Sequence, residues 1–239
     1  MKRTFLFVFV LIPSLLFSQK ELTKNYRTFD QKPIHFGFML GANKGSYDVY
    51  TYNDVYSKYG LTSLTSKKIP GGQVGIVTSL KLGTPILRLR FIPTLSFQER
   101  ALTYSYANPD PTITDSPIIK EQRINSTNLD FPIMLQFRTL RMNNFAAYCL
   151  VGMQPSIDLQ SQEYATQNIA NPFIKVYKKD FQGQVGAGVE FFAPYFKFGM
   201  ELKYSQSFSN NFIQDNTIIS LPINTLYNRV WWFSLIFEG

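Results

Sequence analysis

The sequence predicts an all-β fold, namely an eight-stranded antiparallel up-and-down β-barrel of the type that spans a membrane. Three observations predict it. Apolar and polar residues alternate with a period of two in eight stretches, long and short connections follow one another between those stretches, and charges gather on one face of them. The 239 residues suffice for one such domain, and 16% of them are aromatic, which favours strands.

The beginning of the chain has the pattern of a cleavable secretory signal. A positive start, Lys2 and Arg3, precedes an apolar stretch that ends shortly before Ser18. About a dozen apolar residues are too few to span a bilayer as a helix. We expect residues 1–18 to be removed on export, residues 19–34 to form a polar periplasmic tail, and residues 35–239 to form the barrel.

The alternation locates the eight strands. They cover residues 36–43, 73–82, 87–98, 128–138, 145–156, 180–191, 196–204 and 231–237. The seventh shows the pattern most clearly, because Phe198 and Leu202 lie on the face opposite to Lys197, Glu201 and Lys203. Such strands present one apolar and one polar face.

The connections alternate in length in the way that outer-membrane barrels show. Long ones cover 44–72, 101–124, 157–176 and 209–228, and short ones cover 83–85, 139–144 and 192–194. Short turns are periplasmic and long loops lie outside, so an even strand count places both termini in the periplasm. At the last short turn, pairing Phe191 with Phe196 predicts that Glu190 faces Lys197 and that Gly186 faces Glu201.

Charge decides which face is turned to lipid. Because Lys or Arg at the lipid midplane costs about 2–4 kcal/mol, the charged face must line the lumen. Eight strands leave an interior that side chains fill, whereas water-filled porins need about sixteen. We therefore predict a structural lumen charge network, with an ion path or small-ligand site as the alternative. Its members are Arg88, Arg90, Asp130, Arg138, Glu190, Lys197, Glu201 and Lys203.

Composition excludes several classes of site. With one Cys and one His, the chain has no disulfide framework and no metal site that needs two such ligands. His35 is predicted at the periplasmic rim and Cys149 in the barrel wall. We assign no catalytic, cofactor-binding or metal-binding residue and expect no enzyme.

The positive charge has several interpretations. Without its signal, the chain has 22 Lys and Arg against 16 Asp and Glu. In an exported protein this charge does not indicate nucleic acid. It suits anionic outer-membrane lipid or a protein partner, or is a solvated surface. Arg88 with Lys81 is expected to form a small basic patch near the periplasmic rim.

The final strand resembles the aromatic terminal strand that the barrel-assembly machinery recognises. Its residues Trp231, Phe233, Leu235 and Phe237 alternate, although Glu238 and Gly239 follow the last Phe. The same strand is expected to pair with the first strand and close the barrel.

An ordered set of stretches resembles the PorT family of Bacteroidetes. These are KPIHFGFMLGAN (32–43), RFIPTLSF (90–97), DFPIML (130–135), PYFKF (194–198), ELKYS (201–205) and the ending from Arg229 to Glu238. The resemblance implies an outer-membrane barrel of the type IX secretion system. Its expected role is export of sorting-domain proteins, with gliding motility in some bacteria, through contacts with other secretion-system subunits. The alternatives are a stand-alone surface barrel whose outer loops bind ligands or other surfaces, and a small-solute channel or enzyme.

Overall fold

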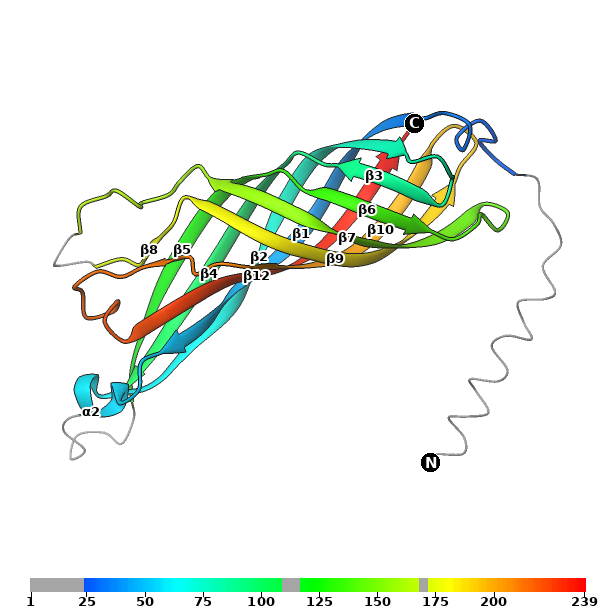
Figure 1. Ribbon diagram of the computed structural model, residues 1–239. Coiled ribbons are helices and arrows are strands. Elements are labelled where there is room, and N and C mark those ends of the chain that lie inside the picture. The colour runs from blue at the N-terminus through cyan, green and yellow to red at the C-terminus, as the bar shows by residue number, and fades with distance from the viewer. Residues whose placement is uncertain (1–23, 109–116, 168–171) are drawn as a thin grey trace, which may run out of the picture.

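The computed structural model describes residues 24–108, 117–167 and 172–239, and its main sheet closes on itself as a barrel (Figure 1). Every neighbouring pair is antiparallel, and β1 closes the ring by pairing with both β12 and β2. The strands are β1 (Ile34–Thr51), β2 (Leu61–Lys81), β3 (Leu87–Phe91), β4 (Thr94–Tyr106), β5 (Ile118–Asp130), β6 (Ile133–Arg138), β7 (Phe145–Asp158), β9 (Lys179–Phe192), β10 (Lys197–Ser207) and β12 (Ile223–Glu238).

The ten strands form eight walls, because two walls are each interrupted once. Pro93 separates β3 from β4, and Pro132 separates β5 from β6. Proline has no backbone N–H for the ladder, so each proline breaks the strand pattern without ending the wall. This arrangement confirms the predicted eight-stranded antiparallel barrel.

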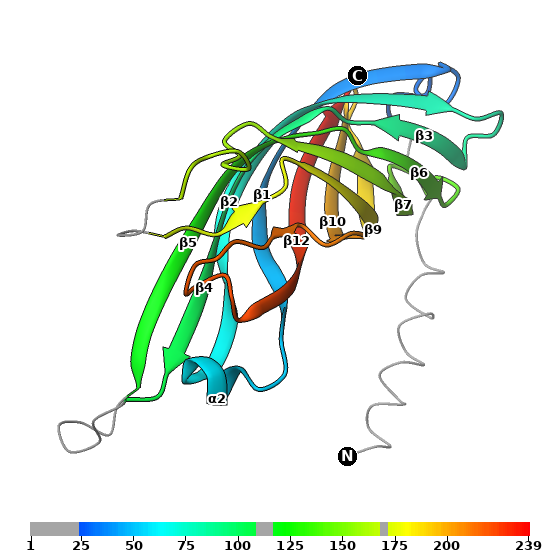
Figure 2. The ribbon, with the colours of Figure 1, turned by 60° about the vertical axis from the view of Figure 1, so that its left-hand side comes forward.

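The strands are longer than predicted at the end away from the termini, which we call the loop end. β2 has 21 residues, and most of the predicted connection 44–72 is strand, apart from a short helix, α2 (Val55–Tyr59). Figure 2 shows β4 and β5 reaching past β7, β9 and β10. A strand that crosses a bilayer needs about 9–11 residues, so this part extends beyond the membrane.

The reason for the misprediction is a reversal of the alternation. The part of the barrel with the predicted pattern, apolar outside and polar inside, is called the membrane band here. Beyond it, toward the loop end, the inner face turns apolar: Leu102, Tyr104 and Leu226 are buried there. The outer face turns polar, with Glu99 and Arg123 paired on it. A search for apolar residues outside and polar residues inside therefore stops at the membrane boundary.

Two short strands lie across the apolar interior of the loop end. β8 (Lys175–Val176) pairs with β11 (Phe212–Ile213), and Val176 and Phe212 pack into the same apolar cluster as Tyr104. The Tyr104 hydroxyl donates a hydrogen bond of 2.8 Å to the Ile219 carbonyl. The loop segments thus cover this end of the barrel.

In the membrane band the two faces differ sharply. Phe36 is 63% exposed on the outer wall, whereas Arg88 is 0% exposed inside. None of the helices in the described parts of the chain is long and apolar enough to cross a bilayer.

Candidate functional site

The lumen contains a continuous chain of ion pairs, in which every member except the half-buried Asp30 is at most 4% exposed. It runs, each residue contacting the next, through Arg88, Asp30, Arg138, Glu190, Lys197, Glu238, Arg90, Glu201 and Lys203. Every predicted network residue except Asp130 belongs to it. Asp30, Glu238 and the Tyr148 hydroxyl were not predicted as members.

One half of the ion-pair chain lies near the end of the barrel where the two termini lie. Lys197 Nζ is 2.8 Å from Glu190 Oε1 and 2.9 Å from Glu238 Oε2. Gln136 Nε2 donates to the same Glu190 oxygen at 2.7 Å. Glu238 follows Phe237, which faces lipid, so alternation alone assigns its side chain to the lumen.

The other half is centred on Glu201. Its carboxylate accepts hydrogen bonds from Arg90 and from the Tyr148 hydroxyl, the latter at 2.8 Å, and lies 3.3 Å from Lys203 Nζ. All these groups are at most about 4% exposed. Removing one member of such a set leaves a charge buried without its partner.

Asp130 lies apart from the ion-pair chain. Its carboxylate accepts hydrogen bonds from the hydroxyls of Ser96, at 2.7 Å, and Ser156. Within the described ranges it has no ion-pair partner. It therefore links β4, β5 and β7 by hydrogen bonds and is not a member of the ion-pair chain.

The turn between β9 and β10 has a different register from the predicted one. Phe192 pairs with Lys197, so Glu190 faces Gly199 and Glu201 faces Gly188, a shift of two positions. The physical reason is that Phe192 packs inward on Phe29, with ring centroids 5.5 Å apart, and extends β9 by one residue. A shift of two keeps every side chain on its face, so Lys197 still reaches Glu190.

The N-terminal segment 24–33, which we call the plug segment, closes the lumen at the end of the barrel where the two termini lie. Phe29 is fully buried and stacks on His35, with centroids 3.7 Å apart. The Arg88 guanidinium and Lys197 Nζ each lie 4.8 Å from the centre of the Phe29 ring. The sole His is therefore covered by an aromatic ring that two buried cations also contact.

The plug segment is also tied to the short turn 139–144. Asn144 Oδ1 accepts a hydrogen bond from the Asn25 backbone at 2.8 Å, and Arg141 donates to the Asn25 carbonyl. The expected polar tail, residues 19–34, is thus folded against the barrel from residue 24 onward, and residues 1–23 lie outside the described part. No alternation or turn signal in the sequence indicated this contact.

The predicted basic patch of Arg88 and Lys81 is wrong. Arg88 is fully buried beneath the plug segment, 3.4 Å from Asp30 Oδ1, and Lys81 Nζ donates to the Asp30 carbonyl at 3.1 Å. Both side chains therefore bind Asp30 of the plug segment and do not form an open basic patch.

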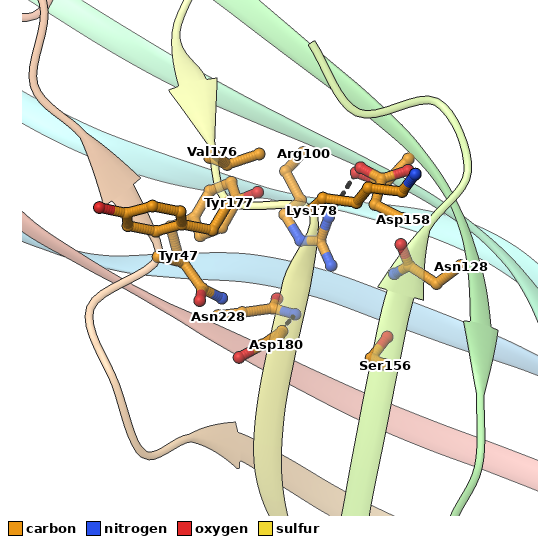
Figure 3. A pocket seen from close by; sticks show the side chains of 12 residues that line it. Tyr47, Arg100, Asn128, Ser156, Asp158, Val176, Tyr177, Lys178, Asp180 and Asn228 are labelled. Atoms are coloured by element: carbon orange, nitrogen blue, oxygen red, sulfur yellow. Dashed lines mark hydrogen bonds between the residues drawn. The ribbon is translucent and has the colours of Figure 1, made fainter. Parts of the chain in front are cut away.

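A small polar cavity lies farther up the lumen (Figure 3). Tyr47, Arg100 and Asp180 are among its lining residues, and its volume is about 20 Å³, room for one water molecule. Arg100 lies 4.9 Å from the Tyr47 ring centre and donates to Ser126 and Gln98. Asp180 Oδ2 accepts from Ser207 at 2.7 Å and from Asn228 at 3.3 Å. Side chains therefore fill this level of the lumen too.

An ion pair joins β8 to the segment that follows β11. Lys175 Nζ is 3.2 Å from Asp215 Oδ2, and this hydrogen bond lowers the pKa of the Asp215 carboxyl. The Ser220 hydroxyl accepts from the Asp215 backbone N–H at 2.8 Å and donates to its carbonyl at 2.7 Å.

Neither a catalytic nor a metal constellation is assembled from these residues. In the parts of the chain that the structure covers, no three His, Cys, Asp or Glu side chains gather as a metal site. Cys149 is exposed on the outer wall, where the sequence placed it.

The aromatic terminal strand forms part of the outer wall. Trp231, Phe233, Leu235 and Phe237 share the outward face of β12, which pairs with β1 and β10. Phe237 stacks on Phe38 with centroids 4.9 Å apart. These residues thus contribute to closing the barrel.

Comparison with known proteins gives one family match and several structural neighbours. The family model described as "Outer membrane protein beta-barrel domain" matches residues 17–213. A search among curated proteins finds no match. The outer membrane protein OprG from Pseudomonas aeruginosa has a TM-score of 0.49 at 11% identity, over 86% of this chain and 92% of that one.

Two further neighbours are similar over comparable lengths. Neisserial surface protein A has a TM-score of 0.43 at 10% identity, covering 85% of this chain and 95% of that one. The outer membrane protease OmpT from Escherichia coli has a TM-score of 0.38 at 12% identity, covering 87% and 95%.

Proposed function

The chain belongs to the outer membrane protein β-barrel domain family and is thus an integral outer-membrane β-barrel protein. We propose that it is a non-enzymatic subunit of the type IX secretion machinery. In this role it supports export of sorting-domain proteins, and gliding in bacteria that glide. It acts through contacts with other subunits of the machine, and the barrel-assembly machinery inserts it.

The observation that carries this proposal is the closed lumen. Buried ion pairs fill the membrane band, the plug segment covers one end, and the β8–β11 pair lies across the other. A barrel filled in this way has no path for a polypeptide, so its contribution to secretion must come from its surfaces. The resemblance of six ordered stretches to the PorT family supplies the identity of the machine.

The proposed orientation places both termini in the periplasm. The short turns and the plug segment then face the periplasmic side, and the extended loop end faces outward. The turn residues Leu140 and Tyr195 are 68% and 88% exposed. They offer apolar contact area to a periplasmic partner.

A stand-alone surface barrel is the second candidate, and the long extension at the loop end favours it. The walls of this part continue well past the membrane band and enclose an apolar cluster of their own. Such a structure suits recognition of ligands or surfaces outside the cell.

Deletion of the gene separates the two candidates. If the chain is a secretion subunit, sorting-domain cargo accumulates in the periplasm of the deletion strain, and the intact gene restores its appearance in the medium. Unchanged secretion, in a strain without a second copy of such a gene, contradicts the proposal. A variant with the 52–60 connection shortened to a tight turn is the matched test of the second candidate. If the chain is a stand-alone surface barrel, this variant loses surface binding while cargo export is unchanged.

A further inference from the structure

The part of β5 nearest the loop end, residues 118–126, is an open sheet edge. β4 pairs with β5 from Tyr106–Ile118 to Thr94–Asp130, whereas β7 pairs only with Asn128, Leu129 and Asp130. Residues 118–126 therefore have a strand neighbour on one side only, within the residues that the structure describes. Figures 1 and 2 show β5 at the margin of the extended sheet.

The hydrogen-bonding direction along this edge follows from two contacts at its base. The Thr127 carbonyl accepts from the Leu159 N–H at 2.8 Å, and the Phe131 N–H donates to the Pro155 carbonyl at 2.9 Å. Odd-numbered residues thus point their backbone groups away from β4, and the β4–β5 register is unbroken above them. Residues 119, 121, 123 and 125 present N–H and C=O groups to the open side.

The other margin of the same opening is covered. The Asn211 N–H donates to the Leu226 carbonyl of β12 at 2.8 Å, and the Leu226 N–H donates to Asn210 Oδ1 at 2.9 Å. The chain therefore satisfies the β12 edge with its own loop and leaves the β5 edge available. An unpaired edge is a template for another strand.

A groove borders the β5 edge. Its volume is about 410 Å³, and its lining includes Ile124 and Asn125 of β5, Phe173 and Ile174 of the facing loop, and Asp158 at the end of β7. Even-numbered β5 residues point to this inner side, where Ile124 is 8% exposed. Lys120 lies in the same inner row, is exposed, and has no ion-pair partner among the described residues.

We propose that the β5 edge binds an extended peptide segment of a protein partner by strand addition. Backbone pairing with residues 119–125 supplies the recognition that an unpaired edge offers. Apolar side chains on alternate positions meet Ile124 and the groove, and a carboxylate meets Lys120. A second copy pairing through its own β5 fits less well, because the inward-facing row of that strand, from Ile118 to Ser126, contains no carboxylate for Lys120. This inference is independent of the secretion role.

A peptide matched to this register tests the proposal. The probe is fluorescein-labelled Thr-Val-Thr-Val-Thr-Glu-Thr, antiparallel to β5, with its Glu opposite Lys120. Its binding to the full chain in detergent micelles is followed by fluorescence anisotropy. We expect saturable binding that is lost when the second and third Thr amides, which face β5, are N-methylated. N-methylation of the second Val amide, which faces away, leaves binding intact.

A pair of protein variants supplies the matched control. Asn125→Pro removes an edge N–H without touching the β4 ladder, whereas Asn125→Ala keeps it. We expect Asn125→Pro, checked for folding by its heat-dependent gel mobility, to weaken probe binding at least about tenfold and Asn125→Ala to bind as the wild type does. Failure of the wild type to bind, or equal binding of the two methylated peptides, overturns the proposal. A wild-type dimer that Asn125→Pro abolishes also overturns it and assigns the edge to a second copy.

Discussion

Single charged side chains in the lumen depend on one another. Glu201 is the shared acceptor of Arg90, Lys203 and Tyr148, and all of them are buried. A carboxylate in this position does not need to increase stability relative to an apolar core. Its removal, however, leaves two cations without their main partner.

We expect Glu201→Ala to lower the free energy of unfolding by about 3–5 kcal/mol. Guanidinium unfolding of the protein in lipid vesicles, followed by tryptophan fluorescence, measures this change. The matched control is Glu121→Ala, because Glu121 forms an ion pair with Arg123 on the solvent-exposed surface. That variant should unfold as the wild type does, since exposed pairs contribute little. Equal losses for both variants would contradict a buried network.

Phe29 determines whether the sole His is accessible. We expect Phe29→Ala to raise the rate at which diethyl pyrocarbonate modifies His35 by about tenfold or more, which corresponds to about 1.4 kcal/mol of lost protection. Tyr195→Ala, at the same end of the barrel but 88% exposed, is the control and should leave the rate unchanged. The rate is read from the absorbance of the modified imidazole. A fast reaction in the wild type would show that the plug segment does not cover His35.

At the scale of elements, the alternation predicted the walls and the inward face, and it failed where the surroundings change. Leu102 and Tyr104 point inward above the membrane, where the outside is water, so the pattern that marks a wall in lipid reverses there. The plug segment escaped prediction for another reason. It has no periodicity, and its position depends on the charged mouth that Phe29 and Asp30 enter.

A glycine lies opposite each proline break, Gly75 beside Pro93 and Gly152 beside Pro132. A Cβ at Gly152 would lie 2.2 Å from the Ile133 carbonyl oxygen, next to Pro132, whereas a Cβ at Gly72 has no neighbour within 4 Å. We therefore expect Gly152→Ala to destabilise the barrel by about 1–3 kcal/mol and Gly72→Ala to be neutral. The midpoint of thermal conversion from the folded to the unfolded gel band measures both. Identical midpoints would mean that the break adjusts without cost.

At the scale of the whole molecule, three separate closures lie in series along the lumen. The plug segment, the ion-pair chain and the strands β8 and β11 lie at three levels of the lumen, and the plug segment contributes one member, Asp30, to the ion-pair chain. Removing the plug segment takes Asp30 out of the ion-pair chain but leaves the links from Glu190 to Lys203 in place. These closures agree with the proposed role, in which the barrel acts through its surfaces on either side of the membrane.

This redundancy predicts that the full chain gives no discrete conductance steps in planar lipid bilayers. Deleting the plug segment, residues 24–33, should not open a path either, because Lys197, Glu190 and Glu238 stay paired behind it. A trimeric porin recorded in the same bilayer setup is the positive control. Steps whose ion selectivity changes with Glu201→Lys would mean that the ion-pair chain lines a conducting path, and the surface-based role would then fall.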